Sequence, residues 1–249
     1  MENSTVLGTN RTGVDMSPID IKEMTALTNV TPPSSPGDER AIARMRGKYI
    51  AEADTLGSIP PPGTLKGVAT TAMQKLTGRN PEAFIDKLGG RVGFERAGVR
   101  LYDALIEKCS AARGTMAASL IPLEILWQFR NEELQHFQLA SDALRSIGAD
   151  PTAQTPCADA DGVAGMGLIQ VLTDPRTSVT QCLEAVLIGE LTDNAAWGLL
   201  IEFAEKMGLD DMARDFEVAL RHEENHLMHV RQWHKEMVLQ DAGIDARST

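Results

Sequence analysis

Apolar residues recur every three or four positions along four long segments of the chain, which is the spacing that places them on one face of an α-helix. The segments cover residues 80–112, 116–147, 178–207 and 210–238. Alternating β-branched runs are few, so the pattern predicts an all-α protein. The pair Gly89-Gly90 lies inside the first segment and predicts a kink there.

The connections between the segments predict how the helices pair. Only "AARGT" separates the first segment from the second, and only "MGLDD" separates the third from the fourth. Connections this short make each pair an antiparallel hairpin. The middle connection, residues 148–177, is about 30 residues long and can cross back along the helices, with "VAGMGLIQVL" predicted as a helix. Two hairpins joined by a long crossover predict an antiparallel four-helix bundle.

The N-terminal region lacks this periodicity. Prolines in "TPPSSPG" and "IPPPG" remove backbone donors that a helix needs. We expect residues 1–62 to form an arm that is extended or partly helical, with a short helix over residues 39–56. Residues 63–79 are expected to hold a short helix and a linker, residues 80–240 the bundle, and residues 241–249 a C-terminal tail.

Composition narrows the class of protein further. The chain has 24 basic and 35 acidic residues and a net charge of −11, which disfavours nucleic acid and anionic membranes as partners. The N-terminus lacks the features of a signal peptide, and no apolar run is long enough to span a bilayer. The cysteines Cys109, Cys157 and Cys182 show no C-x-x-C spacing, which argues against disulfides or a thiolate site. We expect a cytoplasmic protein, and the sequence leaves open whether it forms a homodimer.

Two of the five histidines follow a glutamate by three positions. They form Glu133-x-x-His136 in "EELQH" and Glu223-x-x-His226 in "HEENH". Residues three apart share a helix face, and both pairs share theirs with apolar residues. We therefore expect both pairs to point inward. Glu132 instead shares a face with glutamines and is expected in solvent.

Buried carboxylates and imidazoles are costly unless a cation neutralises the acids. Metal sites in bundles usually take one further carboxylate from each remaining helix. Glu95 in "FERAG" and Glu190 in "GELTDN" lie on apolar faces and, like the two pairs, about 14 to 19 residues from a hairpin turn, so all can meet at one level. Oxygen ligands mixed with imidazoles suit iron or manganese.

The four motifs "FERAG", "EELQH", "GELTDN" and "HEENH" resemble those of the ferritin-like di-metal carboxylate superfamily, which includes ferritins, rubrerythrins, manganese catalases and oxygen-activating di-iron oxidases. The resemblance covers residues 80–238, and more narrowly the chain looks like bacterial ferritin-like domain proteins of undetermined activity. It implies a ferritin-like bundle that binds two iron or manganese ions per chain. It also implies a role for each candidate ligand. Glu95 and Glu190 would be terminal ligands, and Glu133 and Glu223 would be bridging carboxylates. His136 and His226 would each bind one metal.

Two further residues are candidate catalytic groups. Asp193 follows Glu190 by three positions and could bond the outer nitrogen of a ligand histidine or join the ligands itself. Asn194 is a weaker candidate for the same supporting position. Tyr102 lies two turns from Glu95 and could be a hydrogen-bond donor, a radical site or a packing residue.

The remaining histidines and the tryptophans are assigned to structure. We expect the histidines at the surface or in satisfied polar positions, with His229 closest in phase to the cluster: these are His222, His229 and His234. We expect all three tryptophans in the core: Trp127, Trp197 and Trp233.

These residues support three hypotheses on function. The first is an oxidoreductase in which a di-iron or di-manganese centre activates oxygen or peroxide for an unknown small molecule. The second is a ferroxidase or iron-storage protein that needs an assembled shell. The third is a structural helical bundle in which the acids have no catalytic role.

Overall fold

A computed structural model describes residues 17–31, 39–61, 63–64, 67, 80–112 and 120–244. Within these residues it contains seven helices and no strand, which confirms the prediction of an all-α protein. Contacts divide the chain into two units, Met1–Thr55 and Leu56–Thr249, and each is described by itself. The helix expected between residues 63 and 79 lies largely outside the described residues.

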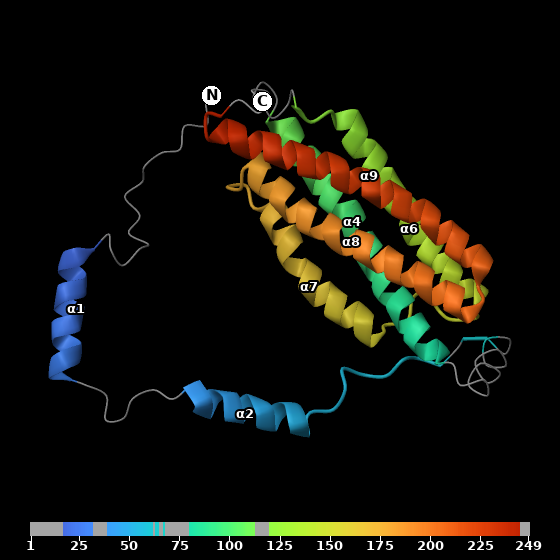
Figure 1. Cartoon of the computed structure of the whole chain (residues 1–249), viewed down its shortest axis with the longest axis horizontal. Coiled ribbons are helices and arrows are strands. Elements are labelled where there is room, and N and C mark those ends of the chain that lie inside the picture. Colours follow the sequence, from blue (N-terminus) through green and yellow to red (C-terminus); the bar gives the residue numbers. More distant parts are fainter. Residues whose placement is uncertain are drawn as a thin grey trace. The chain divides into compact units, whose positions relative to one another are not determined.

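The first unit contains α1 (Pro18–Val30) and α2 (Glu39–Glu52), labelled in Figure 1. Neither helix has a buried residue. The second agrees with the short helix predicted in the arm, whereas the first was not predicted. Its start has a sequence signal that could have found it, because Ser17 precedes a proline at the first helical position.

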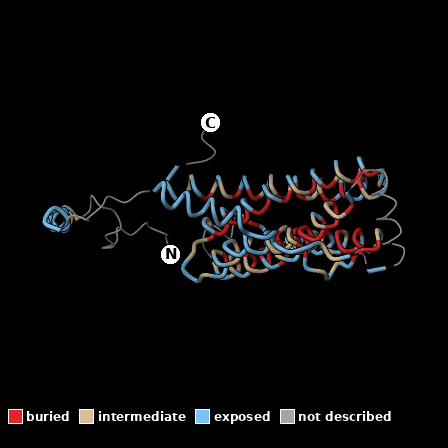
Figure 2. The backbone as a smooth tube through the Cα atoms, turned by 90° about the horizontal axis from the view of Figure 1, so that it is seen from below, coloured by how far each residue is buried: buried red, intermediate tan, exposed pale blue. Residues whose placement is uncertain are grey.

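Four long helices form the interior of the second unit: α4 (Pro81–Ala111), α6 (Leu123–Ser146), α8 (Val179–Met207) and α9 (Asp210–Asp241). Both α4 and α9 contact α6 and α8, so the four helices surround a common interior. Buried residues lie on the inward sides of the helices and exposed residues on the outside (Figure 2).

A fifth helix of this unit, α7 (Pro156–Thr173), lies along α4 and α8 (Figure 1). It is longer than the predicted crossover helix because Thr155 caps it, with the Thr155 hydroxyl accepting from the Ala158 backbone N–H. The next helix, α8, begins at a capping box formed by Ser178 and Gln181 and ends at Gly208, whose φ is 73°. These signals explain why the bounds of α8 agree with those predicted from the sequence.

Two details of the helices differ from the predictions: the start of α6 and the exposure of Trp127. The described part of α6 begins at Leu123 rather than near residue 116, after Pro122 in an extended conformation. The helix α4 continues through Gly89 and Gly90 without a break. Trp127 is 49% exposed rather than part of the core, because it lies one position beyond the buried Leu126 on α6 and so faces outward.

The apolar core consists of two clusters along the four helices. One lies toward the C-terminal ends of α4 and α9 and the N-terminal ends of α6 and α8, and includes Leu105, Phe129 and Trp233. The other includes Phe84, Trp197 and Phe216. Along each helix the buried acids and histidines fall between residues of the two clusters. The core is therefore apolar on both sides of a polar layer.

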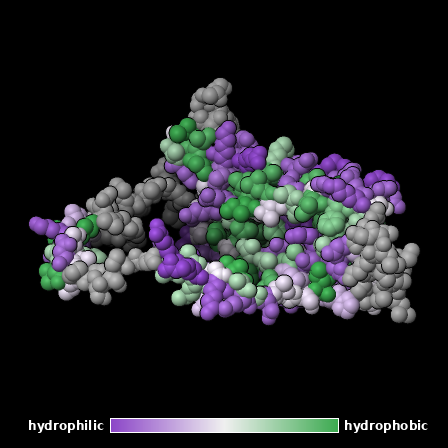
Figure 3. All heavy atoms as spheres, turned by 60° about the horizontal axis from the view of Figure 1, so that its bottom comes forward, coloured by the Kyte–Doolittle hydropathy of each residue, from purple (hydrophilic) through white to green (hydrophobic). Residues whose placement is uncertain are grey.

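The surface of this unit also has exposed apolar side chains, and Figure 3 shows hydrophobic residues gathered on one of its faces. Val163 and Met166 of α7 and Ile188 and Leu191 of α8 are among the exposed ones. Among the described residues, no helix has both the length and the apolar character needed to cross a membrane.

Candidate metal centre

The four long helices place six acids and histidines together in the polar layer. Each of the six side chains is at most 2% exposed. Their phases on the helices are those predicted from the sequence, with one glutamate from α4, one from α8 and a Glu-x-x-His pair from each of α6 and α9. The six residues are Glu95, Glu133, His136, Glu190, Glu223 and His226.

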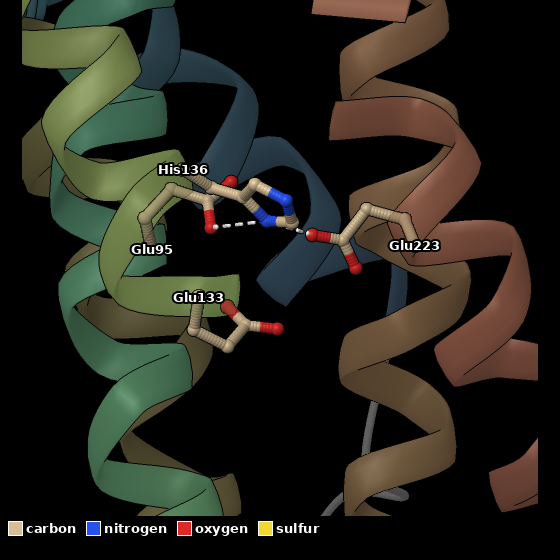
Figure 4. A group of neighbouring side chains, drawn as sticks. All are labelled: Glu95, Glu133, His136 and Glu223. Atoms are coloured by element: carbon tan, nitrogen blue, oxygen red, sulfur yellow. Dashed lines mark ion pairs between the residues drawn. The ribbon is translucent and has the colours of Figure 1, made fainter. Parts of the chain in front are cut away.

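Four of these residues form a group that could hold a metal ion, here called the His136 subsite: Glu95, Glu133, His136 and Glu223. One ligand atom from each lies within 4.8 Å of the others. The Nδ1 atom of His136 lies 2.6 Å from Oε1 of Glu223 and 3.7 Å from Oε2 of Glu95. Figure 4 shows the imidazole between these two carboxylates, which come from opposite sides of the interior.

A second group of the same kind is here called the His226 subsite: Glu133, Glu190, Glu223 and His226. The Nδ1 atom of His226 lies 3.4 Å from Oε1 of Glu133 and 3.4 Å from Oε2 of Glu223. It lies 3.8 Å from Oε2 of Glu190. Both subsites therefore offer one imidazole Nδ1 atom and three carboxylates.

The two subsites share Glu133 and Glu223. Glu223 divides its oxygens between them, because Oε1 faces His136 and Oε2 faces His226. A carboxylate in this position can bind one cation with each oxygen. Glu223 therefore belongs to both groups that could hold a metal ion.

Three carboxylate oxygens at the centre of the cluster have no hydrogen-bond partner among the described residues: Oε2 of Glu95, Oε2 of Glu133 and Oε2 of Glu190. The other buried polar atoms of the cluster pair with one another, as Nδ1 of His136 does with Oε1 of Glu223 at 2.6 Å. Buried polar atoms are nearly always hydrogen-bonded in proteins, so the three unpartnered oxygens suit ligands of a cation better than ordinary packing.

A glycine makes room for one of the shared carboxylates. A Cβ atom at Gly98 on α4 would lie against Oε2 of Glu133, closer than real Cβ atoms come to a neighbour. The missing side chain therefore lets the Glu133 carboxylate lie against the α4 backbone. Together with the donor set and the unpartnered atoms, this space fits a site for divalent cations.

The outer nitrogens of the two histidines are both supported, but by residues that the sequence analysis placed elsewhere. The Nε2 atom of His226 lies 2.7 Å from Oε2 of Glu132. The Nε2 atom of His136 lies 3.2 Å from Nδ1 of His222. The prediction that Glu132 is solvated was therefore wrong, because its long side chain reaches across from α6 to α9.

The two supporting residues have related positions in the sequence. Glu132 directly precedes Glu133, and His222 directly precedes Glu223. Each supports the histidine of the opposite helix. A polar residue immediately before both Glu-x-x-His pairs was the signal that could have found them.

Asp193 lies in the layer, but it does not support either histidine, because the outer nitrogens of both have other partners. Its carboxylate forms an ion pair with Arg91 of α4, and both side chains are buried. The same guanidinium has its Nε atom 2.8 Å from Oε1 of Glu95. The sequence analysis missed Arg91, although a basic residue four positions before Glu95 on an inward face was a signal for it.

Tyr102 and Asn194 both contact residues of the cluster. Tyr102 is buried, and its hydroxyl donates to Oε1 of Glu190 at 2.5 Å. The Asn194 side-chain amide donates to the backbone carbonyls of Glu190 and Glu223, and so ties α8 to α9. The remaining histidine close in phase, His229, has Nδ1 2.9 Å from the carbonyl oxygen of Asn225.

Aromatic rings cover both histidines. The ring of Phe129 has its centroid 4.1 Å from that of His226. The ring of Trp197 lies 5.9 Å from that of His136, and Trp197 is fully buried. The cluster is therefore enclosed by aromatic side chains as well as by the helices.

Burial changes the acidities of the cluster. It raises the pKa of Glu133 to about 8, with repulsion from Glu223 as a further cause. Burial likewise raises the pKa of Glu95, Glu190 and Asp193 well above the usual carboxyl range. In Glu223 burial has the same tendency, but the two imidazoles outweigh it and the pKa is lowered.

One histidine also has a shifted pKa. Burial by itself lowers the pKa of His226, but the carboxylates of Glu132, Glu133 and Glu223 outweigh it, so the pKa is raised well above the usual value. In the metal-free protein, these carboxyl groups and His226 therefore keep protons that a bound cation would displace.

Comparisons with known proteins add no relative to this picture. No family model matches the chain, and neither a curated protein nor a solved structure matches it. The interpretation of the centre therefore rests on its geometry, which is that of buried carboxylate and histidine groups that could hold metal ions.

Proposed function

We propose that this chain is a ferritin-like four-helix bundle that holds two iron or manganese ions and works as an oxidoreductase on oxygen or peroxide. The ligands would be Glu95, Glu133, His136, Glu190, Glu223 and His226. The observation that carries the proposal is the position of Glu223, whose two oxygens face two different histidines. In that position Glu223 could offer one oxygen to each of two ions.

The charge of the layer supports two divalent ions. Four ligand glutamates and Asp193 carry five negative charges when they are ionised, and Arg91 carries one positive charge. The remainder of four negative charges equals the charge of two divalent cations. Histidine ligands are neutral when they bind metal, so they leave this balance unchanged.

Redox-active ions, if held by these carboxylates and imidazoles, would supply electrons to a small oxidant such as oxygen or peroxide. The residues of the chain orient and shield such a centre. The Tyr102 hydroxyl keeps its proton and donates a hydrogen bond to Oε1 of Glu190, at the edge of the cluster. Phe129 and Trp197 cover the imidazoles and exclude water from them.

A surface pocket lined by Asn194 of α8 and by residues of α9 is the proposed binding place for a small molecule. Its lining includes Asn194, Leu227 and His229. Asn194 also hydrogen-bonds the backbone of Glu190 and Glu223. One residue thus both lines the pocket and contacts the backbone of two proposed ligands.

Metal analysis of purified protein tests the proposal. After anaerobic loading with Fe(II) or Mn(II) and removal of free metal, elemental analysis should find about two ions per chain, as the two subsites require. Oxygen or peroxide added to the iron-loaded protein should then be consumed, as followed with an electrode. Less than half an ion per chain after loading would overturn the proposal.

Two neighbouring glutamates on α9 provide a matched control. Glu223→Gln removes the shared carboxylate and should abolish binding of the second ion. Glu224→Gln alters the exposed neighbour and should leave both ions bound. Equal metal content in the two variants would contradict the assignment of Glu223.

A further inference from the structure

The two subsites offer the same kinds of ligand and differ in what surrounds them. Each has one imidazole Nδ1 atom, one terminal glutamate and the two shared carboxylates. In each, the terminal glutamate directs Oε2 toward its histidine, at 3.7 Å for Glu95 and 3.8 Å for Glu190. Any difference in cation affinity must therefore come from the neighbouring groups.

The first difference lies behind the histidines. His226 has the Glu132 carboxylate on its outer nitrogen, whereas His136 has the imidazole of His222. A carboxylate can only accept, so it fixes the proton of His226 on Nε2 and leaves Nδ1 free to bind a cation. It also makes the ring a stronger donor. An imidazole can donate or accept in that position, so His222 gives His136 neither a fixed proton nor a negative charge.

The second difference lies at the terminal glutamates. Oε1 of Glu95 faces the guanidinium of Arg91 at 2.8 Å, whereas Oε1 of Glu190 accepts from the neutral hydroxyl of Tyr102 at 2.5 Å. A buried positive charge beside a ligand repels an incoming cation. Asp193 offsets part of this charge through its own ion pair with Arg91, but it leaves the guanidinium beside Glu95.

Both differences favour the same subsite. Resting on the proposed di-metal function, we infer that the two subsites are inequivalent and that the His226 subsite takes the first divalent cation. The His136 subsite then fills at higher metal concentration. The carboxylate behind His226 and the guanidinium beside Glu95 determine this order.

Titration of the metal-free full-length chain with Mn(II), followed by loss of the free-ion electron paramagnetic resonance signal, tests the order. Wild-type protein should bind one ion per chain tightly and a second at least about tenfold more weakly, which is the lower range for such supporting residues. His136→Ala should keep the tight step and lose the weak one. His226→Ala should lose the tight step.

A second pair of variants keeps the test valid if an alanine variant fails to fold. Glu132→Gln should weaken the tight step about tenfold or more, because an amide cannot supply the negative charge. His222→Gln should weaken only the second step. Circular dichroism of each metal-free variant verifies that the helices are intact.

The outcomes separate this inference from the proposed function. Two ions bound in a single step, or a tight step that is lost in His136→Ala and kept in His226→Ala, would overturn the order of filling while leaving a di-metal protein. Wild-type protein that binds less than half an ion per chain would overturn both.

Discussion

At the scale of single residues, a substitution at Gly98 tests whether the position of Glu133 matters for metal binding. The missing side chain of Gly98 leaves space for the Glu133 carboxylate. Gly98→Ala should leave the helices folded, since the atom in the way is the end of a flexible side chain. Glu133 must then move, so both subsites lose their geometry. We expect metal affinity to fall about tenfold or more, as measured by Mn(II) titration.

Gly93 on the same helix is the control, because a Cβ atom there would meet nothing within 4 Å. Gly93→Ala should keep its metal affinity. It should also gain up to about 1 kcal/mol in the free energy of unfolding from helix propensity. Unchanged metal affinity in both variants would show that the position of Glu133 is unimportant.

Arg91 offers a second prediction at this scale. Arg91→Met leaves Asp193 and Glu95 without the buried cation that they contact. Breaking a buried ion pair from one side costs about 3–5 kcal/mol, so we expect a loss of this size in the free energy of unfolding of the metal-free protein. Urea denaturation in the presence of a chelator measures it.

The double variant Arg91→Met with Asp193→Asn separates charge from packing. Because it removes both members of the pair, it should be less destabilised than the single variant. A double variant at least as unstable as Arg91→Met alone would mean that Arg91 acts through its size rather than its charge.

At the scale of the elements, Gly89 tests how α7 packs on α4. A Cβ atom at Gly89 would lie 2.6 Å from Oγ1 and 2.8 Å from Cγ2 of Thr155, the residue that caps α7. Gly89→Ala should therefore lower the free energy of unfolding, although alanine favours a helix. Thermal unfolding compares it with Gly93→Ala, and a gain in stability in both would refute this role of Gly89.

The helices could be predicted where local signals mark their ends. Asn80-Pro81 precedes α4, Ser178 caps α8 and Gly208 ends it, and these bounds agreed with the sequence. The start of α6 was placed too early because periodicity continued past Pro122. Helical phase also found the burial of the six proposed ligands, since direction from a helix axis follows from spacing alone.

Phase could not find the residues around the six. Glu132 lies one position from Glu133, where phase assigns it to a polar face, yet its side chain is long enough to reach His226 on another helix. The pairing of Asp193 with Arg91, rather than with a histidine, depends on how α4 and α8 pack. The residues that a long side chain can contact on another helix, and the packing between helices, depend on tertiary structure. Periodicity within one helix therefore carries no information on them.

At the scale of the whole molecule, the buried acids make metal-free stability depend on pH. The folded protein holds the Glu133 proton up to a pKa of about 8, whereas an ordinary glutamate releases it near 4.5. Between these values the unfolded chain binds fewer protons, so the free energy of unfolding falls as the pH rises. The raised pKa values of Glu95, Glu190 and Asp193 act in the same direction.

Calorimetry of the metal-free protein should therefore show a melting temperature that falls from about pH 5 to about pH 8. The melting temperature of metal-loaded protein should fall little over this range, because the cations replace the protons and bind more tightly as the ligands ionise. The stabilisation by metal should thus grow with pH. A metal-free melting temperature that rises between these pH values would contradict the raised carboxyl pKa values.

The polar layer between the two apolar clusters has a consequence for how the molecule opens. Each cluster is apolar within itself, but the layer that joins them consists of mutually repelling acids once they are ionised. Regions with separate apolar contacts can unfold as separate cooperative units. Metal ions that bind all four helices would merge the two into one, so metal loading would decide whether the ends of the helices unfold independently or together.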